Sequence, residues 1–164
     1  MADRRVLVGW AAECAVRVVG LVEGDPRVRG AVEAAEGFAA GGERTKRIRD
    51  AAWGALAAAR ESGDPVWTAA ARAAGYAAGA AYVHDLVSAH QVKHVLGPAV
   101  QMALAEELAA GVPEVGEDAV RWAVEIAPAG VRGMVVELPQ ATFGKSRVGV
   151  LSRLLDQGLR TGPR

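Results

Sequence analysis

Hydrophobic side chains recur every three or four positions along most of the chain, and this spacing places them on one face of an α-helix. Residues 4–22 show it first, with an apolar face made of Val6, Leu7, Trp10, Cys14, Val18, Leu21 and Val22. The periodicity continues through residues 26–40 and 43–61; the latter segment is basic in its first half and rich in alanine in its second. The pattern predicts three helices in this part of the chain.

Two tripeptides of identical sequence join the predicted helices in pairs. Gly24-Asp25-Pro26 and Gly63-Asp64-Pro65 lie 39 residues apart. Each supplies a glycine that ends one helix, an aspartate N-cap and a proline at the first position of the next helix, where a missing N–H costs nothing. Alanines at equivalent positions after both tripeptides favour two similar helical hairpins, either because the unit is duplicated or because this connector is common.

A nearly uncharged segment follows the second tripeptide. Residues 65–82 contain Arg72 as their single charged side chain, so we expect a central helix that is buried on most sides. Helical periodicity continues over residues 85–96, and Gly97-Pro98 is expected to break or kink the chain because Pro98 lacks an amide donor. Residues 98–110 are then predicted to form a further helix.

The last third of the chain has weaker patterns. Residues 111–117 are expected to form a loop and residues 118–127 a short helix. Residues 129–138 are rich in glycine and valine and fit either a short helix or a strand. A final helix is predicted over residues 145–160, where apolar side chains again recur at helical spacing.

Together these segments predict an all-α protein with a single-domain bundle of about six to eight helices. The chain has 164 residues, which suits one domain with a sizeable core. Within it, residues 4–62 hold the first hairpins, residues 63–110 the central helices, and residues 111–160 the C-terminal helices. Aromatic residues make up only 5% of the chain, so small side chains must pack the helices closely. Gly75 and Gly79 would either admit a neighbouring helix or leave room for a ligand.

Charge and cysteine content narrow the possible partners and environments. The 19 basic residues balance the 19 acidic ones, so no overall charge attracts nucleic acid or an anionic membrane. No apolar run reaches the ~20 residues needed to span a bilayer, and no signal peptide is recognisable, so we expect a cytoplasmic protein. The single cysteine, Cys14, excludes an intrachain disulfide and is expected to be a buried, inert thiol.

The three histidines are the main candidates for chemistry, because His84, His90 and His94 fall within eleven residues. His90 and His94 are four positions apart, which places them about 40° apart on one helical face. Such a pair suits general acid–base catalysis or metal binding, and Tyr82 and Asp85 are the neighbours that would orient a substrate or a ring. The alternative is a pair of hydrogen-bonded histidines at the edge of the core.

We expect no organic cofactor, and a divalent metal on His90 and His94 is the one ion that the sequence suggests. Glu106 or Glu107 would be the carboxylate that completes such a site. The Gly-Lys-Ser sequence ending at Ser146 is part of a phosphate-binding motif, but Pro139 stands where that motif requires glycine. Nucleotide binding is therefore not expected.

Several segments, in their order along the chain, resemble a family of small, all-helical immunity proteins common in actinobacteria. The resemblance covers about residues 6–110. The segments that carry it are Trp10-Ala11-Ala12-Glu13-Cys14-Ala15, Asp25-Pro26-Arg27 followed by Ala34 and Ala35, Ala71-Arg72-Ala73-Ala74-Gly75, and His90-Gln91-Val92-Lys93-His94-Val95-Leu96-Gly97. The family label implies binding and neutralising a toxin-like partner protein, and it supplies no catalytic residues.

Two functions therefore remain open. The first is an immunity-type binding protein that presents a charged helical face to a partner protein, and Arg44, Lys46, Arg47 and Arg49 form a basic cluster that suits an acidic surface. The second is a small helical enzyme or small-molecule-binding protein, for example in secondary metabolism, with an apolar cavity that the histidines face. Apolar positions on the last helix would also permit a homodimer.

Overall fold

The computed structural model describes residues 2–83 and 88–162, and this part of the chain contains helices and no strand. The helices are α1 (Ala2–Val19), α2 (Pro26–Ala39), α3 (Lys46–Glu61), α4 (Pro65–Gly79), a short 3₁₀ turn (Ala80–Tyr82), α5 (Ala89–Ala110), α6 (Pro113–Ile126), α7 (Ala129–Glu137) and α8 (Arg147–Thr161). The predicted all-α single-domain bundle is confirmed.

The aspartate and the proline of both Gly-Asp-Pro tripeptides start helices as predicted. The predicted role of their glycines is wrong, because α1 ends earlier, at Val19, and α3 ends at Glu61 with Ser62 as its C-cap. A side-chain oxygen of Asp25 accepts a hydrogen bond from the Arg27 backbone N–H at 2.9 Å, and Asp64 accepts one from the Trp67 N–H at 3.0 Å. A proline occupies the first turn of both α2 and α4. The same local chemistry therefore starts the second helix of each hairpin.

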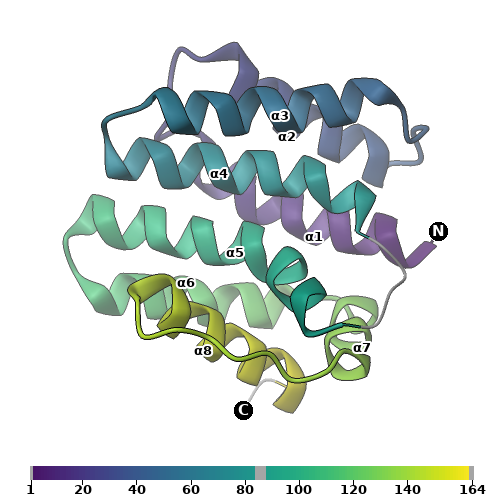
Figure 1. The fold of residues 1–164 in the computed structure, drawn as a ribbon, viewed down its shortest axis with the longest axis vertical. Helices are drawn as coiled ribbons and strands as arrows, with labels where there is room; N and C mark the ends of the chain where they lie inside the picture. Colours follow the sequence, from purple (N-terminus) through teal and green to yellow (C-terminus); the bar gives the residue numbers. More distant parts are fainter. Residues whose placement is uncertain (1, 84–87, 163–164) are drawn as a thin grey trace.

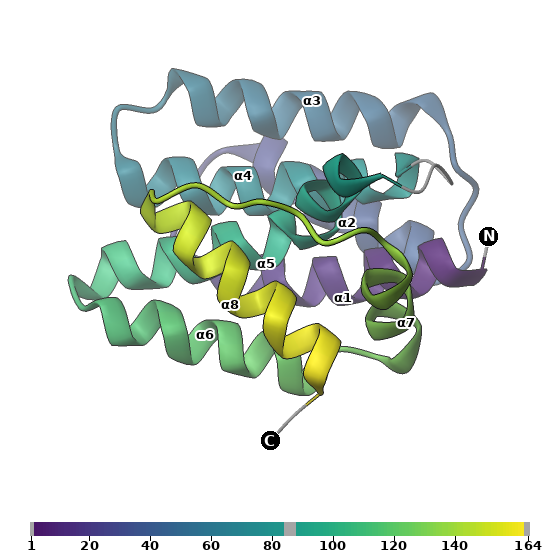
Figure 2. The same ribbon diagram turned by 60° about the horizontal axis from the view of Figure 1, so that its bottom comes forward.

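Helices α4 and α5 form the centre of the bundle. Helix α4 packs against α1, α2, α3 and α5, and α5 packs against α1, α4, α6 and α8. Figure 1 shows α3, α4, α5 and α6 stacked in that order, and α8 crosses in front of α5 and α6 in Figure 2. Within the described residues, no helix combines the length and apolar character needed to cross a membrane, and this includes the nearly uncharged α4.

Helix α4 is thin, and this lets its neighbours approach closely. Apart from Gly75, its buried residues are all alanines. A Cβ atom built on Gly75 would lie 2.8 Å from Leu56 Cδ2 and 3.2 Å from the Ala52 carbonyl oxygen on α3. Any larger residue here would force Leu56 and the backbone of α3 to shift, so the structure supports the packing explanation for Gly75.

The expected separation of two helices at Gly97-Pro98 is wrong, because α5 continues through Pro98 as one helix. Proline removes one hydrogen bond within a helix and crowds the preceding turn, at about 3 kcal/mol. Contacts with four other helices hold α5 together across this position. Figure 2 shows that the first turns of α5 are set at an angle to the remainder, which agrees with the kink expected from proline.

In the last third of the chain, two segments differ from the sequence prediction or resolve an ambiguity that it left. The loop predicted over residues 111–117 is wrong beyond its first two residues, since α6 begins at Pro113, a position where proline is favoured. Gly111 ends α5 with a φ of +68°, in the left-handed region that glycine adopts readily. The ambiguous segment 129–138 is helical and forms α7.

Candidate functional site

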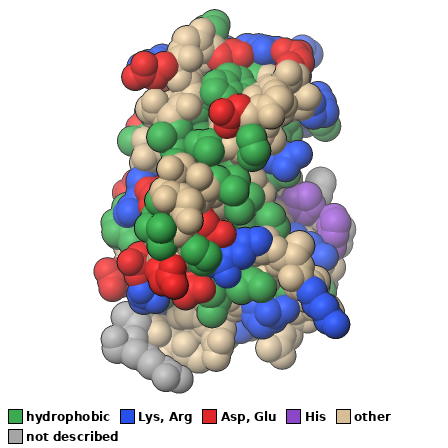
Figure 3. Space-filling model, turned by 90° about the vertical axis from the view of Figure 1, so that its left-hand side faces the viewer, with side chains coloured by type: hydrophobic (Ala, Val, Ile, Leu, Met, Phe, Trp, Pro, Cys, Tyr) green, Lys and Arg blue, Asp and Glu red, His purple; other side chains and the backbone are tan. Residues whose placement is uncertain are grey.

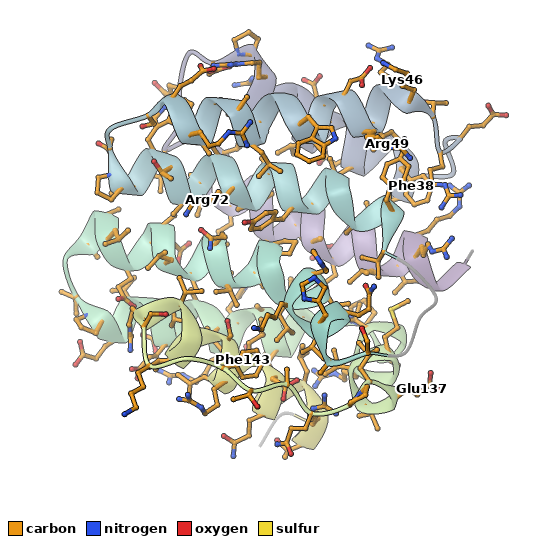
Figure 4. The ribbon with its side chains drawn as sticks, in the orientation of Figure 1. Phe38, Lys46, Arg49, Arg72, Glu137 and Phe143 are labelled. Atoms are coloured by element: carbon orange, nitrogen blue, oxygen red, sulfur yellow. The ribbon has the colours of Figure 1, made fainter. Side chains whose placement is uncertain are left out.

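A groove of about 840 Å³ opens between α3, α4, the first half of α5 and the segment that enters α8. Its size is that of a ligand or peptide site. The lining is largely apolar, with the aromatic side chains Trp53, Tyr76, Tyr82 and Phe143. In Figure 4, Arg49 on α3 and Phe143 before α8 lie on opposite sides of the first turns of α5. Helices distant in sequence therefore form the two walls.

The charged side chains of the groove are cationic. Arg49 and Lys93 line it, and among the described residues no Asp or Glu does. The N-terminus of α8 also lies here, where the hydroxyl of Ser146 accepts a hydrogen bond from the Gly149 N–H at 3.2 Å. The N-terminal end of a helix carries a partial positive charge. The groove is thus locally positive although the whole chain has no net charge.

His90 and His94 lie together on the first turns of α5 and line the groove. Both are exposed, their Nε2 atoms are 3.1 Å apart, and their rings are nearly perpendicular with centroids 4.7 Å apart. Figure 3 shows the described histidines gathered at one edge of the molecule, beside Lys and Arg side chains. The predicted shared face is confirmed, and the catalytic role stays a prediction.

Tyr82 lines the same groove, but its hydroxyl is engaged elsewhere. The hydroxyl donates a hydrogen bond to the backbone carbonyl of Thr45 at 2.6 Å. The guanidinium groups of Arg49 and Arg44 lie 4.6 and 5.5 Å from the centre of its ring. These cation–π contacts tie the basic cluster to the end of α4. Tyr82 therefore contributes its ring to the groove wall, and its phenol holds the segment between α2 and α3.

The other two predicted site residues, His84 and Asp85, lie outside the described residues. Of the five candidates, the structure brings His90 and His94 into contact and places Tyr82 in the same groove.

The groove is also lined by two glutamines, which the sequence patterns did not single out as site residues. Gln91 and Gln101 are both more than nine-tenths buried, and within the described part of the chain neither Oε1 atom has a hydrogen-bond partner. A buried amide oxygen without a partner is unfavourable and is uncommon in folded proteins. The signal available in the sequence was Gln101, the single polar side chain in the run from Leu96 to Ala105.

Two aromatic side chains of the groove are well exposed. Trp53 on α3 is 61% exposed and Tyr76 on α4 is 37% exposed. The Tyr76 ring passes directly over Gly97 of α5, where a Cβ atom would lie 3.1 Å from the ring. A Cβ atom placed on Gly79 would have no neighbouring atom within 4 Å, so Gly79 lines the groove next to open space. Large exposed aromatics of this kind are typical of protein-binding surfaces.

The carboxylates expected to complete a metal site are paired elsewhere. Glu106 forms an ion pair with Arg17, whose guanidinium also stacks on Trp122 at 4.4 Å. The buried Glu107 pairs with Arg147 at 2.8 Å, and hydrogen bonds from this guanidinium to Glu107 raise the pKa of Arg147. Neither glutamate lines the groove, and the described residues contain no group of three or more His, Cys, Asp or Glu side chains suited to a metal.

Cys14 is buried, and burial raises the pKa of its thiol far above the ordinary value. A thiol in this state is neither a nucleophile nor a metal ligand at neutral pH. This environment is consistent with the buried, inert thiol that the sequence predicts for Cys14.

The fold and the site define a class: a small helical-bundle protein with an open, aromatic and locally positive groove. The family described as "Imm-5 like putative immunity protein" matches residues 1–130, and the chain belongs to this family. The resemblance seen in the sequence is confirmed. No curated protein and no solved structure matches the chain. The matched region ends within α7, so Phe143 and Ser146 come to the groove from outside it.

Proposed function

We propose that the protein binds a toxin-like partner protein and neutralises it, and that the groove is the surface that receives the partner. Membership of an immunity protein family supports a partner protein. We choose the groove as the binding surface because it exposes the aromatic pair Trp53 and Tyr76. It is also lined by cationic side chains and, among the described residues, by no carboxylate. The cytoplasm is the compartment we assign to this activity.

Aromatic side chains in such a setting dominate binding energies. Tryptophan and tyrosine are frequent among the few interface residues whose truncation weakens binding by about 2 kcal/mol or more. Trp53 lies beside Leu56 on the groove wall, so a partner side chain inserted here would be shielded from water. Among the described residues the buried oxygens of Gln91 and Gln101 have no hydrogen-bond partner, and after rotation of the side chains they would accept hydrogen bonds from N–H groups of an inserted segment.

Charge selects the kind of partner surface. Arg49 and Lys93 are exposed at the groove, and the positive end of α8 adds to their field. A segment that carries Asp or Glu next to apolar side chains would be attracted and oriented by these groups. The partner surface is therefore acidic and apolar, and electrostatic attraction makes its association rate fall as salt is added.

The experiment uses the proteins encoded on either side of this gene. Each is expressed in a bacterial host with and without this chain, and growth and complex formation are measured. We expect one neighbour to arrest growth alone and this chain to restore growth. Replacing Trp53→Ala should weaken binding about thirtyfold, which corresponds to about 2 kcal/mol, and Arg49→Glu should slow association.

The matched control is Arg29→Glu, because Arg29 is exposed on α2 and lies outside the groove. It makes the same change of charge and should leave growth rescue and affinity unchanged. A toxic neighbour that this chain neither binds nor neutralises contradicts the function. Rescue that survives both groove substitutions contradicts the assignment of the surface.

A further inference from the structure

We infer that His90 and His94 together bind one divalent transition-metal ion at the edge of the groove, through the Nε2 atom of each ring. This site does not depend on the proposed immunity function. It rests on the position of the two imidazoles in the folded chain, since both are exposed and both stand on the first turns of α5.

The distance between the two nitrogens is the first argument. An imidazole nitrogen binds zinc at about 2.0–2.1 Å. Two such ligands are then about 3.3 Å apart in a tetrahedral site and about 2.9 Å apart in adjacent positions of a square-planar or octahedral one. The observed separation of 3.1 Å lies between these values. The separation of the two nitrogens therefore suits one ion, and both rings would turn so that their Nε2 lone pairs converge on it.

The chemistry of the metal-free pair is the second argument. The contact between the two Nε2 atoms requires one of them to carry a hydrogen and the other to present its lone pair. When an ion binds, each neutral ring turns its Nε2 lone pair to the metal and carries its hydrogen on Nδ1. Binding through both Nε2 atoms therefore requires both rings in the neutral form.

The neighbouring side chains determine how tightly the pair binds an ion and how many coordination positions of that ion stay open to water. Lys93 and Arg49 line the same groove and oppose a cation, although solvent screens these exposed charges. The described residues offer no third His, Cys, Asp or Glu that would complete a cluster. An ion on this pair keeps at least two positions for water, so the affinity is far below that of a four-ligand structural zinc site.

The test is calorimetric titration of the full chain, freed of any histidine tag and of metal, with CuCl₂, NiCl₂ and ZnCl₂. One ion per chain is expected, with copper bound more tightly than nickel or zinc. His90→Ala and His94→Ala should each weaken nickel binding at least about tenfold, because each leaves a single imidazole. Lys93→Ala is the matched control, and it should keep or increase the affinity because it removes a nearby positive charge.

A second measurement separates binding at the pair from binding elsewhere. Nickel should raise the unfolding temperature of the unaltered chain and of Lys93→Ala, and it should have no such effect on either histidine variant. Circular dichroism of the variants without metal shows that they are folded, as expected for exposed side chains. Absence of binding at millimolar metal, or equal affinity in the chain and in both histidine variants, overturns the site.

Discussion

At the scale of single residues, identical side chains on one helix have different roles because their neighbours differ. Gly75 and Gly79 are four positions apart on α4 and both line the groove. At Gly75 the side chain of Leu56 and the carbonyl of Ala52 occupy the space that a Cβ atom would need, whereas at Gly79 that space is open. One glycine permits helix packing and the other leaves room in the groove.

This contrast predicts opposite effects of the same substitution. Gly75→Ala should lower the free energy of unfolding by about 1–3 kcal/mol, because α3 and α4 must move apart. Gly79→Ala should be neutral or stabilising by up to about 1 kcal/mol, since Gly79 has helical dihedral angles that alanine adopts without strain. Urea unfolding of both variants measures the difference. Equal losses of stability in the two variants would contradict the packing explanation.

At the scale of helices, the start of each element depends on side chains that are close in sequence, and α2 shows how such a cap is reinforced. Besides capping α2, Asp25 accepts hydrogen bonds from the Arg27 guanidinium, which also reaches Glu61 at the end of α3 at 2.7 Å. The Arg27 side chain and backbone N–H hold the pKa of the Asp25 carboxyl below its usual range. The cap thus joins α2 to α3.

Asp25→Ala should lower the free energy of unfolding by about 1 kcal/mol at pH 7, the usual effect of losing an N-cap. The carboxyl has a lower pKa in the folded chain than in the unfolded chain, so its contribution is present above the ordinary value of about 3.9. It is lost as the pH falls through the lowered folded-state pKa.

Chemical denaturation of the chain and of Asp25→Ala at several pH values between 7 and 2 measures this effect. The difference in stability should shrink at the acidic end. Asp64→Ala removes the equivalent cap of α4 and is the control for loss of an N-cap alone, since the Asp64 side chain caps the Trp67 N–H. A difference that stays constant down to the lowest pH would contradict the role of the Asp25 charge.

At the scale of the whole molecule, α8 completes the groove, and an ion pair fixes α8 against the rest. Arg147, the first residue of α8, donates hydrogen bonds to the buried carboxylate of Glu107 on α5 and to the Pro113 carbonyl at the start of α6. At the opposite end of α6, the indole of Trp10 donates a hydrogen bond to the Ala123 carbonyl at 2.9 Å and joins α1 to α6. The bonds of Arg147 hold α8, one wall of the groove, against α5 and α6.

Arg147→Ala should lower the free energy of unfolding by about 2 kcal/mol, because it leaves the buried Glu107 carboxylate without its cation. The loss falls below the full value for a buried pair since the Arg147 side chain is 31% exposed. Arg153→Ala is the control on the same helix, because Arg153 is exposed and its hydrogen bonds within the described residues go to carbonyls of the preceding loop. Thermal and urea unfolding measure both variants, and equal stabilities would contradict the role of the pair.

Local patterns along the chain were sufficient to predict most of the helices, both aspartate caps and the shared face of His90 and His94, but they missed the start of α6 and left residues 129–138 open between helix and strand. Each of these depends on residues within about one helical turn, where periodicity and capping chemistry act directly. The same patterns failed at Pro98, because contacts of α5 with four other helices outweigh what proline does to an isolated helix.

The groove itself was decided by tertiary packing. Its walls come from α3, from α4 and from the segment before α8, so their meeting depends on contacts between residues far apart in sequence. Long-range partners also determined that the Tyr82 hydroxyl bonds to Thr45 and that Glu106 and Glu107 pair with arginines of α1 and α8. Helical periodicity says which face of a helix is buried, but it carries no information about which other helix covers that face.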